Sequence, residues 1–254
     1  MTLRARWGAL PEEAQEKILD KHRDWNVDYG WWECCKEYFT EIMEGRGVFV
    51  KDTRFSGFWS QGDGASFAGH IEDFQKFIES YDLLKYQPLI DFARHDDWRE
   101  FVFEADFNGW QYSRSNTMGF HHRLDDNYDL VGDPLLQAAQ RQLVEDMQAM
   151  ASEFFDDAER IFKEAADEYY CDLEAEYEGL TSDDAVLEAL MSNEDSLEEE
   201  IKDYEHEHAE ESKEELPSLG DDPDPCHSPQ PTPVGEVSAP PGREMAPGRA
   251  RSAG

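Results

Sequence analysis

The chain has 254 residues, which is enough for one domain with a sizeable core or for two small ones. Aromatic residues make up 13% of the chain, and 59 acidic residues against 23 basic ones give a formal net charge of -36. So large a negative charge repels nucleic acid phosphates and anionic membranes, so we expect no direct binding to either and favour a partner protein with a basic surface.

The cysteines and the first residues bear on the compartment. Cys34 and Cys35 are neighbours, and Cys171 and Cys226 lie far from them, without the CxxC spacing or the paired framework of a zinc or disulfide site. The first residues lack the apolar core of a signal peptide, and no apolar run approaches the roughly 18 residues of a membrane span. These features predict a cytoplasmic protein with no membrane-spanning helix, no cofactor and no metal.

Two helices are expected near the start of the chain. The first begins at residues 10–13 (LPEE), where a proline and two acids suit a first turn and apolar residues follow at helical spacing. The second runs from Asp28 or Trp31 to Met43 and ends before the glycines of residues 45–47.

The hydrophobic period then changes to that of strands. Residues 48–50 and 54–59 are typical of strand, and residues 65–71 are typical of a returning strand. Residues 61–64 (QGDG) are predicted to form the tight turn between them, with both glycines at positive φ. The pattern predicts a β-hairpin.

A second hairpin is expected after a short helical region over residues 72–81 and 89–98. Residues 100–107 alternate in part, Asn108-Gly109 is typical of a hairpin turn, and residues 110–124 return. The predicted fold class is therefore α+β, with a small antiparallel sheet of about four strands in two hairpins. This sheet packs with N-terminal helices and one long amphipathic C-terminal helix.

The long helix is the clearest element of the sequence. It begins at Asp133-Pro134, carries apolar residues at steps of three or four, and is expected to run for about ten turns to a point near Gly179. Residues 181–184 (TSDD) resemble a capping box that starts another short helix. We expect residues 1–203 to form a single α+β domain and residues 204–254, acidic and then rich in Pro, Ser and Gly, to be disordered.

Three stretches of the sequence resemble a known group of proteins. They are residues 31–33 (WWE), residues 55–67 (FSGFWSQGDGASF) and residues 180–186 (LTSDDAV), within a resemblance that spans residues 12–203. They are similar to a family of small bacteriophage and prophage proteins that carry an FSGFxSQGDGAxF motif, some of which are labelled antitoxin-like. The resemblance implies a cytoplasmic phage-type accessory protein that acts on host defence, and it implies no set of catalytic residues. The tail from Pro217 departs from that family.

The hairpin motif is the first candidate site. As a binding surface it would present polar groups and aromatic rings from one loop, namely Ser56, Phe58, Trp59, Ser60, Gln61, Asp63 and Ser66. In the structural interpretation the glycines only make the turn, and the aromatic residues, including Phe58 or Trp59, pack in the core. The motif is not a phosphate loop, because no lysine follows the glycines and Asp63 repels phosphate.

The acidic face of the long helix is the second candidate site. From Glu145 to Glu215 the sequence has 28 Asp and Glu residues against 4 Lys and Arg residues. The predicted face consists of Glu145, Asp146, Glu153, Asp156, Asp157, Glu164, Asp167 and Glu168. On a rigid helix such acids stand about 5–6 Å apart, close to the phosphate separation along one DNA strand, so the face would imitate a nucleic acid backbone. The simpler interpretation is a solvated surface.

A catalytic or metal-binding alternative would use the histidines or cysteines. His121 and His122 point to opposite faces of a predicted strand, so they cannot share one metal without distortion. Cys34 or Cys35 would need an imidazole partner to act as a nucleophile, and the sequence has no signature for one. We therefore assign no catalytic residue.

Three functions remain open at this point, and the oligomeric state is left open with them. The leading hypothesis is a phage-type protein that binds a host protein, such as a nucleic-acid-handling defence factor, by acidic-surface mimicry. The alternative is an antitoxin-like or regulatory binding module that acts through the aromatic hairpin. The third is a small enzyme that uses the hairpin loop with His121 or His122.

Overall fold

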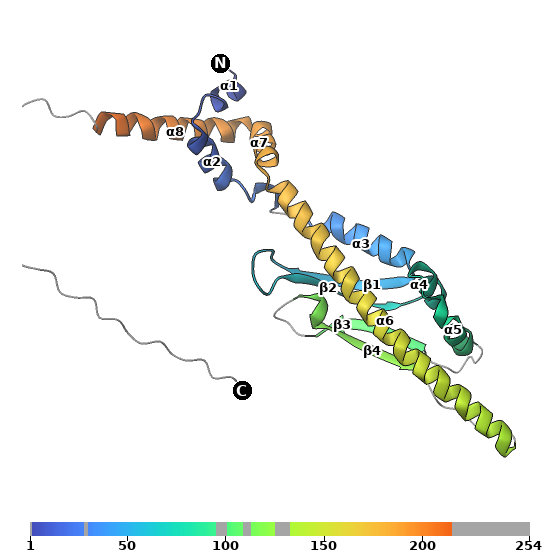
Figure 1. Cartoon of the computed structure of the whole chain (residues 1–254). Coiled ribbons are helices and arrows are strands. Elements are labelled where there is room, and N and C mark those ends of the chain that lie inside the picture. The colour runs from blue at the N-terminus through green and yellow to red at the C-terminus, as the bar shows by residue number, and fades with distance from the viewer. Residues whose placement is uncertain (1, 28–29, 95–100, 109–112, 125–132, 215–254) are drawn as a thin grey trace, which may run out of the picture. The chain divides into compact units, whose positions relative to one another are not determined.

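The structure is a computed structural model that describes residues 2–27, 30–94, 101–108, 113–124 and 133–214 (Figure 1). By its contacts the chain divides into one unit, Met1–His208, and a second, Ala209–Gly254. The first unit holds the sheet and every described helix except the end of the last one. Among these residues, no helix is both long enough and apolar enough to cross a membrane.

Helices precede and follow a small sheet along the chain. The described helices are α1 (Leu3–Trp7), α2 (Glu12–Lys21), α3 (Glu33–Gly45), α4 (Phe74–Ser80), α5 (Gln87–Arg94), α6 (Pro134–Leu180), α7 (Asp183–Ser192) and α8 (Glu194–Glu214). The strands are β1 (Val48–Ser56), β2 (Gly64–Ile71), β3 (Phe101–Phe107) and β4 (Met118–Leu124). They form one antiparallel sheet in the order β1-β2-β3-β4. The predicted α+β fold class is confirmed, including the four strands and the long helix.

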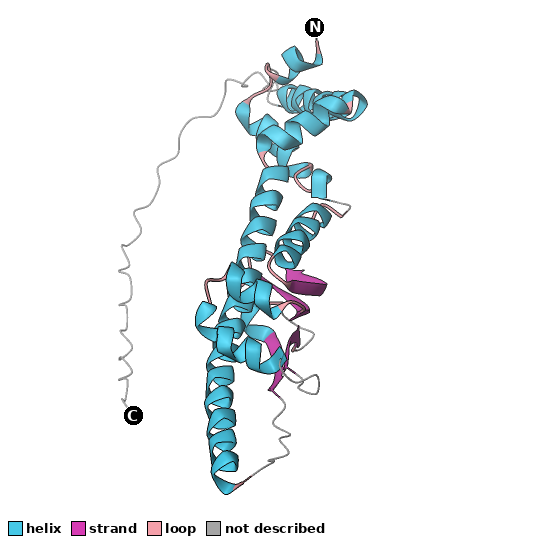
Figure 2. Ribbon diagram, turned by 90° about the vertical axis from the view of Figure 1, so that its right-hand side faces the viewer, coloured by secondary structure: helices cyan, strands magenta, loops and turns pink. Residues whose placement is uncertain are grey.

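The main core lies between the sheet and α6. This helix crosses the sheet (Figure 1), and the strands gather on one side of it (Figure 2). Phe162 of α6 stacks on Phe67 of β2 at 5.1 Å between ring centroids and meets Phe103 of β3 edge-on at 5.0 Å. Phe39 of α3 contacts Phe67 from the β1 side, and it stacks on Tyr169 of α6. Large aromatic side chains therefore supply much of the buried area of an otherwise strongly charged chain.

A second apolar cluster, here called the end cluster, joins helices from both ends of the folded chain. Trp7 of α1 and Ile18 of α2 pack with Leu190 of α7 and with Leu197 and Ile201 of α8. Ion pairs between α1 or α2 and α8 border it, namely Arg6–Glu205 at 3.0 Å, Lys17–Glu207 at 3.2 Å and Lys21–Glu200 at 2.6 Å. The end cluster thus ties α8 to the first helices by both apolar burial and charge.

The predicted tail boundary is wrong for the residues that follow it. Helix α8 continues to Glu214, so residues 204–214 are helical rather than disordered. Burial of Ile201 and the ion pairs of Glu205 and Glu207 stabilise a helix whose own composition is too polar to predict it. Residues 215–254 of the predicted tail lie outside the described residues.

Two other expectations also need correction. The ends predicted for the long helix are right to within a residue, but its 47 residues correspond to about 13 turns rather than ten. The return strand predicted from residue 110 is confirmed only over Met118–Leu124. Ser115–Thr117 is a 3-10 turn instead, in which the Thr117 hydroxyl donates to the Arg114 carbonyl at 2.9 Å. Residues 109–112 and Trp98 lie outside the described residues.

Candidate protein-binding surfaces

The loop between β1 and β2 is held from both ends. Gly57 has a φ of 42°, a left-handed conformation that favours glycine, and its carbonyl accepts a hydrogen bond from the Tyr170 hydroxyl of α6 at 3.3 Å. Further along the loop, a carboxylate oxygen of Asp63 accepts a hydrogen bond from the Ser60 backbone N–H. A Cβ on Gly57 would lie 3.0 Å from that carboxylate. The loop therefore has a defined conformation around Phe58 and Trp59.

These contacts divide the predicted hairpin residues into two groups. Phe58 faces inward, where it stacks on Tyr170 at 5.6 Å and lies 5.0 Å from Tyr177. Asp63 closes the loop, and Ser66 is buried with 2% of its surface exposed. Ser56 is half-buried, and the exposed members of the motif are Trp59, Ser60 and Gln61. Phe58, Asp63 and Ser66 therefore have the structural roles of the simpler interpretation, while Trp59, Ser60 and Gln61 are exposed to possible partners.

The two glycines of the turn, Gly62 and Gly64, were predicted to supply positive φ angles, but Gly64 acts through close packing instead. Neither Gly62 nor Gly64 has a positive φ angle, so that prediction is wrong. Gly64 is buried, and a Cβ there would lie 2.9 Å from Cγ of Arg114 and 3.0 Å from the carbonyl oxygen of Ser113. The absence of a side chain on Gly64 lets the segment before β4 lie directly against the hairpin.

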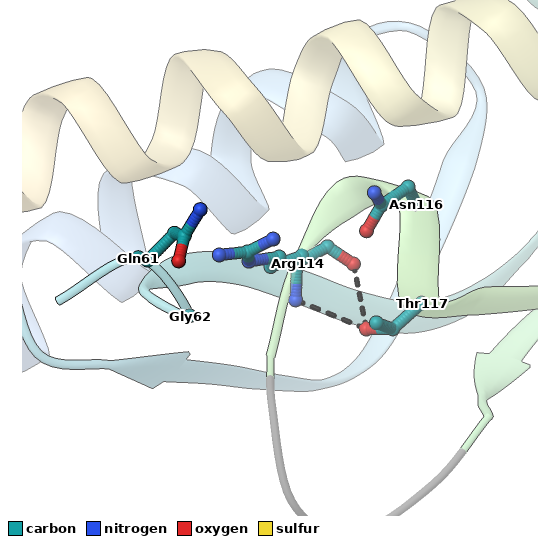
Figure 3. Close-up of a pocket in the computed structure, with 5 residues that line it drawn as sticks. All are labelled: Gln61, Gly62, Arg114, Asn116 and Thr117. Atoms are coloured by element: carbon teal, nitrogen blue, oxygen red, sulfur yellow. Dashed lines mark hydrogen bonds between the residues drawn. The ribbon is translucent and has the colours of Figure 1, made fainter. Parts of the chain in front are cut away.

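This close approach shapes a pocket of about 580 Å³ beside the hairpin, lined by Gln61, Gly62, Arg114, Asn116 and Thr117. In Figure 3 the Arg114 guanidinium extends toward Gln61, and its buried Nε has no hydrogen-bond partner among the described residues. The lining is polar and offers N–H donors to a small anionic or carbonyl group. His121 and His122 line a different cavity of about 390 Å³. The enzyme hypothesis joined the hairpin loop to these histidines, and the two line separate cavities.

An aromatic cluster beside the loop escaped sequence reasoning. It consists of Trp31, Trp32, Phe55, Phe58, Tyr170 and Tyr177. Trp31 is its centre, with ring centroids 5.8 Å from Phe55, 5.9 Å from Phe58 and 5.7 Å from Tyr177. The motifs before α3 and after β1 were visible in the sequence. The fold adds Tyr170 and Tyr177 of α6 to the cluster. In the sequence these tyrosines looked like part of the apolar stripe of the helix, so nothing marked them as part of a separate cluster.

Helix α6 carries its exposed acids on the face opposite the core. The predicted residues Glu145, Glu153, Asp156, Asp167 and Glu168 are exposed, and no ion pair or hydrogen bond joins their side chains to other described residues. Asp146 is also exposed and accepts a hydrogen bond from Gln142 one turn earlier. Most of the predicted acidic face is therefore unneutralised.

Arg160 interrupts this acidic face in the middle of the helix. Its guanidinium lies 3.0 Å from the carboxylate of Glu164 and 3.4 Å from that of Asp157. Asp157 is half-buried, accepts a hydrogen bond from the Tyr86 hydroxyl at 2.7 Å and pairs with Lys85 at 3.0 Å. The Tyr86 hydrogen bond, followed by the bonds to Lys85 and Arg160, holds the pKa of Asp157 below its usual value. Asp157 is thus engaged within the protein, and the unpaired acids lie on either side of Arg160.

The histidines and cysteines do not assemble a site in the described part of the chain. His122 stacks on Phe155 of α6 at 4.3 Å, while His121, the next residue of β4, points to the other face of the sheet. Cys35 packs against the main core, and burial raises the pKa of its thiol. Within the described ranges, no three His, Cys, Asp or Glu side chains have an arrangement that could hold a metal ion.

The sequence was compared with family models, curated proteins and solved structures. A family model described as a domain of unknown function, DUF8835, matches residues 31–183. The match begins at the central ring of the aromatic cluster, includes the whole sheet and α6, and ends at the first residue of α7. No match was found among curated proteins or solved structures. Because the matched segment is more than half of the chain, the protein belongs to the DUF8835 family.

Proposed function

We propose that the protein is a non-enzymatic binding protein that docks the acidic face of α6 on the basic surface of another protein. The observation that carries this proposal is the row of exposed, unpaired carboxylates along one uninterrupted helix. The helix fixes their spacing before any partner arrives, so little ordering has to accompany binding. A net charge of -36 adds a long-range attraction to a basic partner.

The proposed partner is a protein that itself grips nucleic acid. Along the helix axis, Glu153 and Asp156 are about 4.5 Å apart, and Asp167 follows about 16 Å further on. These carboxylates do not repeat the spacing of a phosphate backbone, but they present negative charge at fixed positions to a groove lined by lysine and arginine. The resemblance to phage and prophage proteins supports a setting in the cytoplasm of a bacterial host, with a defence factor that handles nucleic acid as the target.

Neutralising the acidic face tests this proposal. The full-length protein, immobilised, is exposed to an extract of bacterial cells, and the captured proteins are identified by mass spectrometry. A variant with Glu153→Gln, Asp167→Asn and Glu168→Gln should capture less of the partner, by about threefold or more. The reason is that it loses three exposed charge pairs, each of which contributes ~0.2–1 kcal/mol. Added salt and added duplex DNA should both release the partner from the wild-type protein.

The matched control removes the same charge elsewhere. Glu16→Gln, Glu37→Gln and Glu41→Gln change three exposed acids of α2 and α3 and should leave capture intact. Equal loss in both variants would show that total charge matters and that the α6 face does not. Capture that neither salt nor DNA weakens would rule out nucleic acid mimicry.

A second candidate is an antitoxin-like or regulatory module that acts through the hairpin alone. The exposure of Trp59, 73% of its surface, favours this function, because tryptophan is enriched among the residues that carry most of the binding energy of protein interfaces. The same capture separates the two candidates. Trp59→Ala would then abolish binding, while neutralisation of the α6 acids would leave it unchanged.

A further inference from the structure

Trp59 directly follows Phe58 of the aromatic cluster in the chain, and the geometry of the loop limits where its ring can lie. Two hydrogen bonds flank the Phe58-Trp59 pair, one from the Tyr170 hydroxyl to Gly57 and one from the Ser60 N–H to Asp63. Phe58 is anchored by its stacking on Tyr170. Trp59 has no ring partner among the described residues. Its indole is therefore presented to solvent from a loop that has little freedom to fold it away.

A second indole is exposed at the edge of the cluster. Trp32 has 37% of its surface exposed and lies 5.9 Å from Phe55 and 6.1 Å from Trp31. Its inner side is thus covered, in part by these two rings, and only the exposed part of the indole faces water. Because the rings inside the cluster contact one another, a ligand would reach the exposed parts of Trp32 and Trp59 from the solvent side.

Carboxylates border the same surface. The Tyr177 hydroxyl donates to Asp24 at 3.4 Å. Burial raises the pKa of the Tyr170 hydroxyl, the charges of Glu174 and Asp63 raise it further, and the charge of Arg114 lowers it. Three carboxylates thus stand near the cluster against the guanidinium of Arg114, so the local field disfavours an anionic ligand. A cation gains from the field and from the negative faces of the indole rings at the same time.

We infer that Trp32 and Trp59 form an anchoring surface for arginine side chains of a basic partner protein. The inference rests on the proposed function, since it assigns a specific contact to the same basic partner. Arginine fits better than lysine, because a planar guanidinium stacks on an indole and is less strongly hydrated than an ammonium group. The protein already contains a guanidinium over an aromatic ring, although that ring is a phenyl: Arg54 lies 3.9 Å from the centre of the Phe107 ring.

Short basic peptides test the anchoring surface without knowledge of the partner. The full-length protein is titrated at low ionic strength with capped Arg-Ser repeat peptides and with Lys-Ser peptides of equal length, using isothermal calorimetry. We expect the arginine peptide to bind more tightly. Trp32→Leu and Trp59→Leu should each weaken its binding about two- to fivefold, as expected for a cation–π contact at an exposed site. The lysine peptide should lose less.

Two controls make the outcome decisive. Phe49→Leu replaces an aromatic residue of similar exposure to Trp32 outside the cluster and should leave both affinities unchanged. Circular dichroism of each variant confirms that the exposed substitutions leave the fold intact. Arginine affinity that is unchanged in both tryptophan variants, or an equal loss for arginine and lysine, would overturn the inference.

The triple variant of α6 separates this inference from the proposed function. If the tryptophan variants bind normally while the α6 variant binds both peptides more weakly, the anchoring surface is wrong and the acidic face stands. If the tryptophan variants lose arginine binding while the α6 variant behaves as wild type, the acidic face is wrong and the anchoring surface stands. If the wild-type protein binds neither peptide, both ideas fail.

Discussion

At the scale of single residues, the hydrogen bond from Tyr86 to Asp157 offers a stability test with a defined pH dependence. Removing this hydroxyl by Tyr86→Phe should lower the free energy of unfolding by about 1.5 kcal/mol at pH 7, because the bond goes to a charged acceptor. The pKa of Asp157 is lowered in the folded state, so its contribution is complete above the ordinary aspartate value of about 3.9 and is lost as the pH falls through the lower folded value. Urea unfolding at pH 7 and near pH 3 should therefore show a difference between the two proteins that shrinks at the acid end. A difference equal at both pH values would contradict this account.

The hairpin shows how far residue roles could be predicted from the sequence. The motif was correctly placed in a hairpin, and its division between core and surface was open in the sequence. Positive φ was assigned to the glycines around Asp63, but it occurs at Gly57. The reason is tertiary, since Gly57 is fixed by Tyr170, which is 113 residues away in the sequence. Local turn chemistry contains no information about that contact.

At the scale of elements, the pairing of β1 with β2 depends on one glycine. Gly69 pairs with Val50 beside a bulge in β1, and a Cβ on it would lie 2.2 Å from the backbone carbonyl oxygen of Phe49. Backbone cannot give way as a side chain can, so Gly69→Ala should lower the free energy of unfolding by about 3 kcal/mol. Gly45→Ala at the end of α3 is the control: a Cβ there meets no atom within 4 Å, and stability should be unchanged or slightly raised. Thermal unfolding of the two variants side by side measures both effects.

The elements most easily predicted are those with a strong period. Helix α6 and the strands β1 and β2 follow directly from their apolar spacing. Helix α8 could not be predicted in this way beyond residue 203, because its few apolar residues are surrounded by acids. Its helical state depends on packing against α1 and α2. The 3-10 turn before β4 was predicted as strand although its sequence, Ser115-Asn116-Thr117, contains common turn residues.

At the scale of the whole molecule, the main core and the end cluster are separate groups of buried residues, and their independence can be measured. Ile201→Ala should cost the end cluster about 2–5 kcal/mol through the cavity it leaves. If the two clusters open separately, amide hydrogen exchange should accelerate in α2, α7 and α8 while the protection of β2 is unchanged. Faster exchange in β2 to the same degree would instead show one cooperative unit. The sequence pattern could not predict this division, because the end cluster combines residues that come before the sheet in the sequence with residues that come after it.

Arg160 gives the acidic helix an unusual evolutionary option. Most single changes in a contact surface subtract from binding, yet in the proposed acidic surface the central position is occupied by a cation that pairs with neighbouring carboxylates. Loss of the Arg160 charge would leave the Glu164 carboxylate unpaired and deepen the negative potential where the row is broken. If the proposed function holds, one substitution at Arg160 would strengthen binding to a basic partner, just as the loss of one acid would weaken it, without any change to the helix itself.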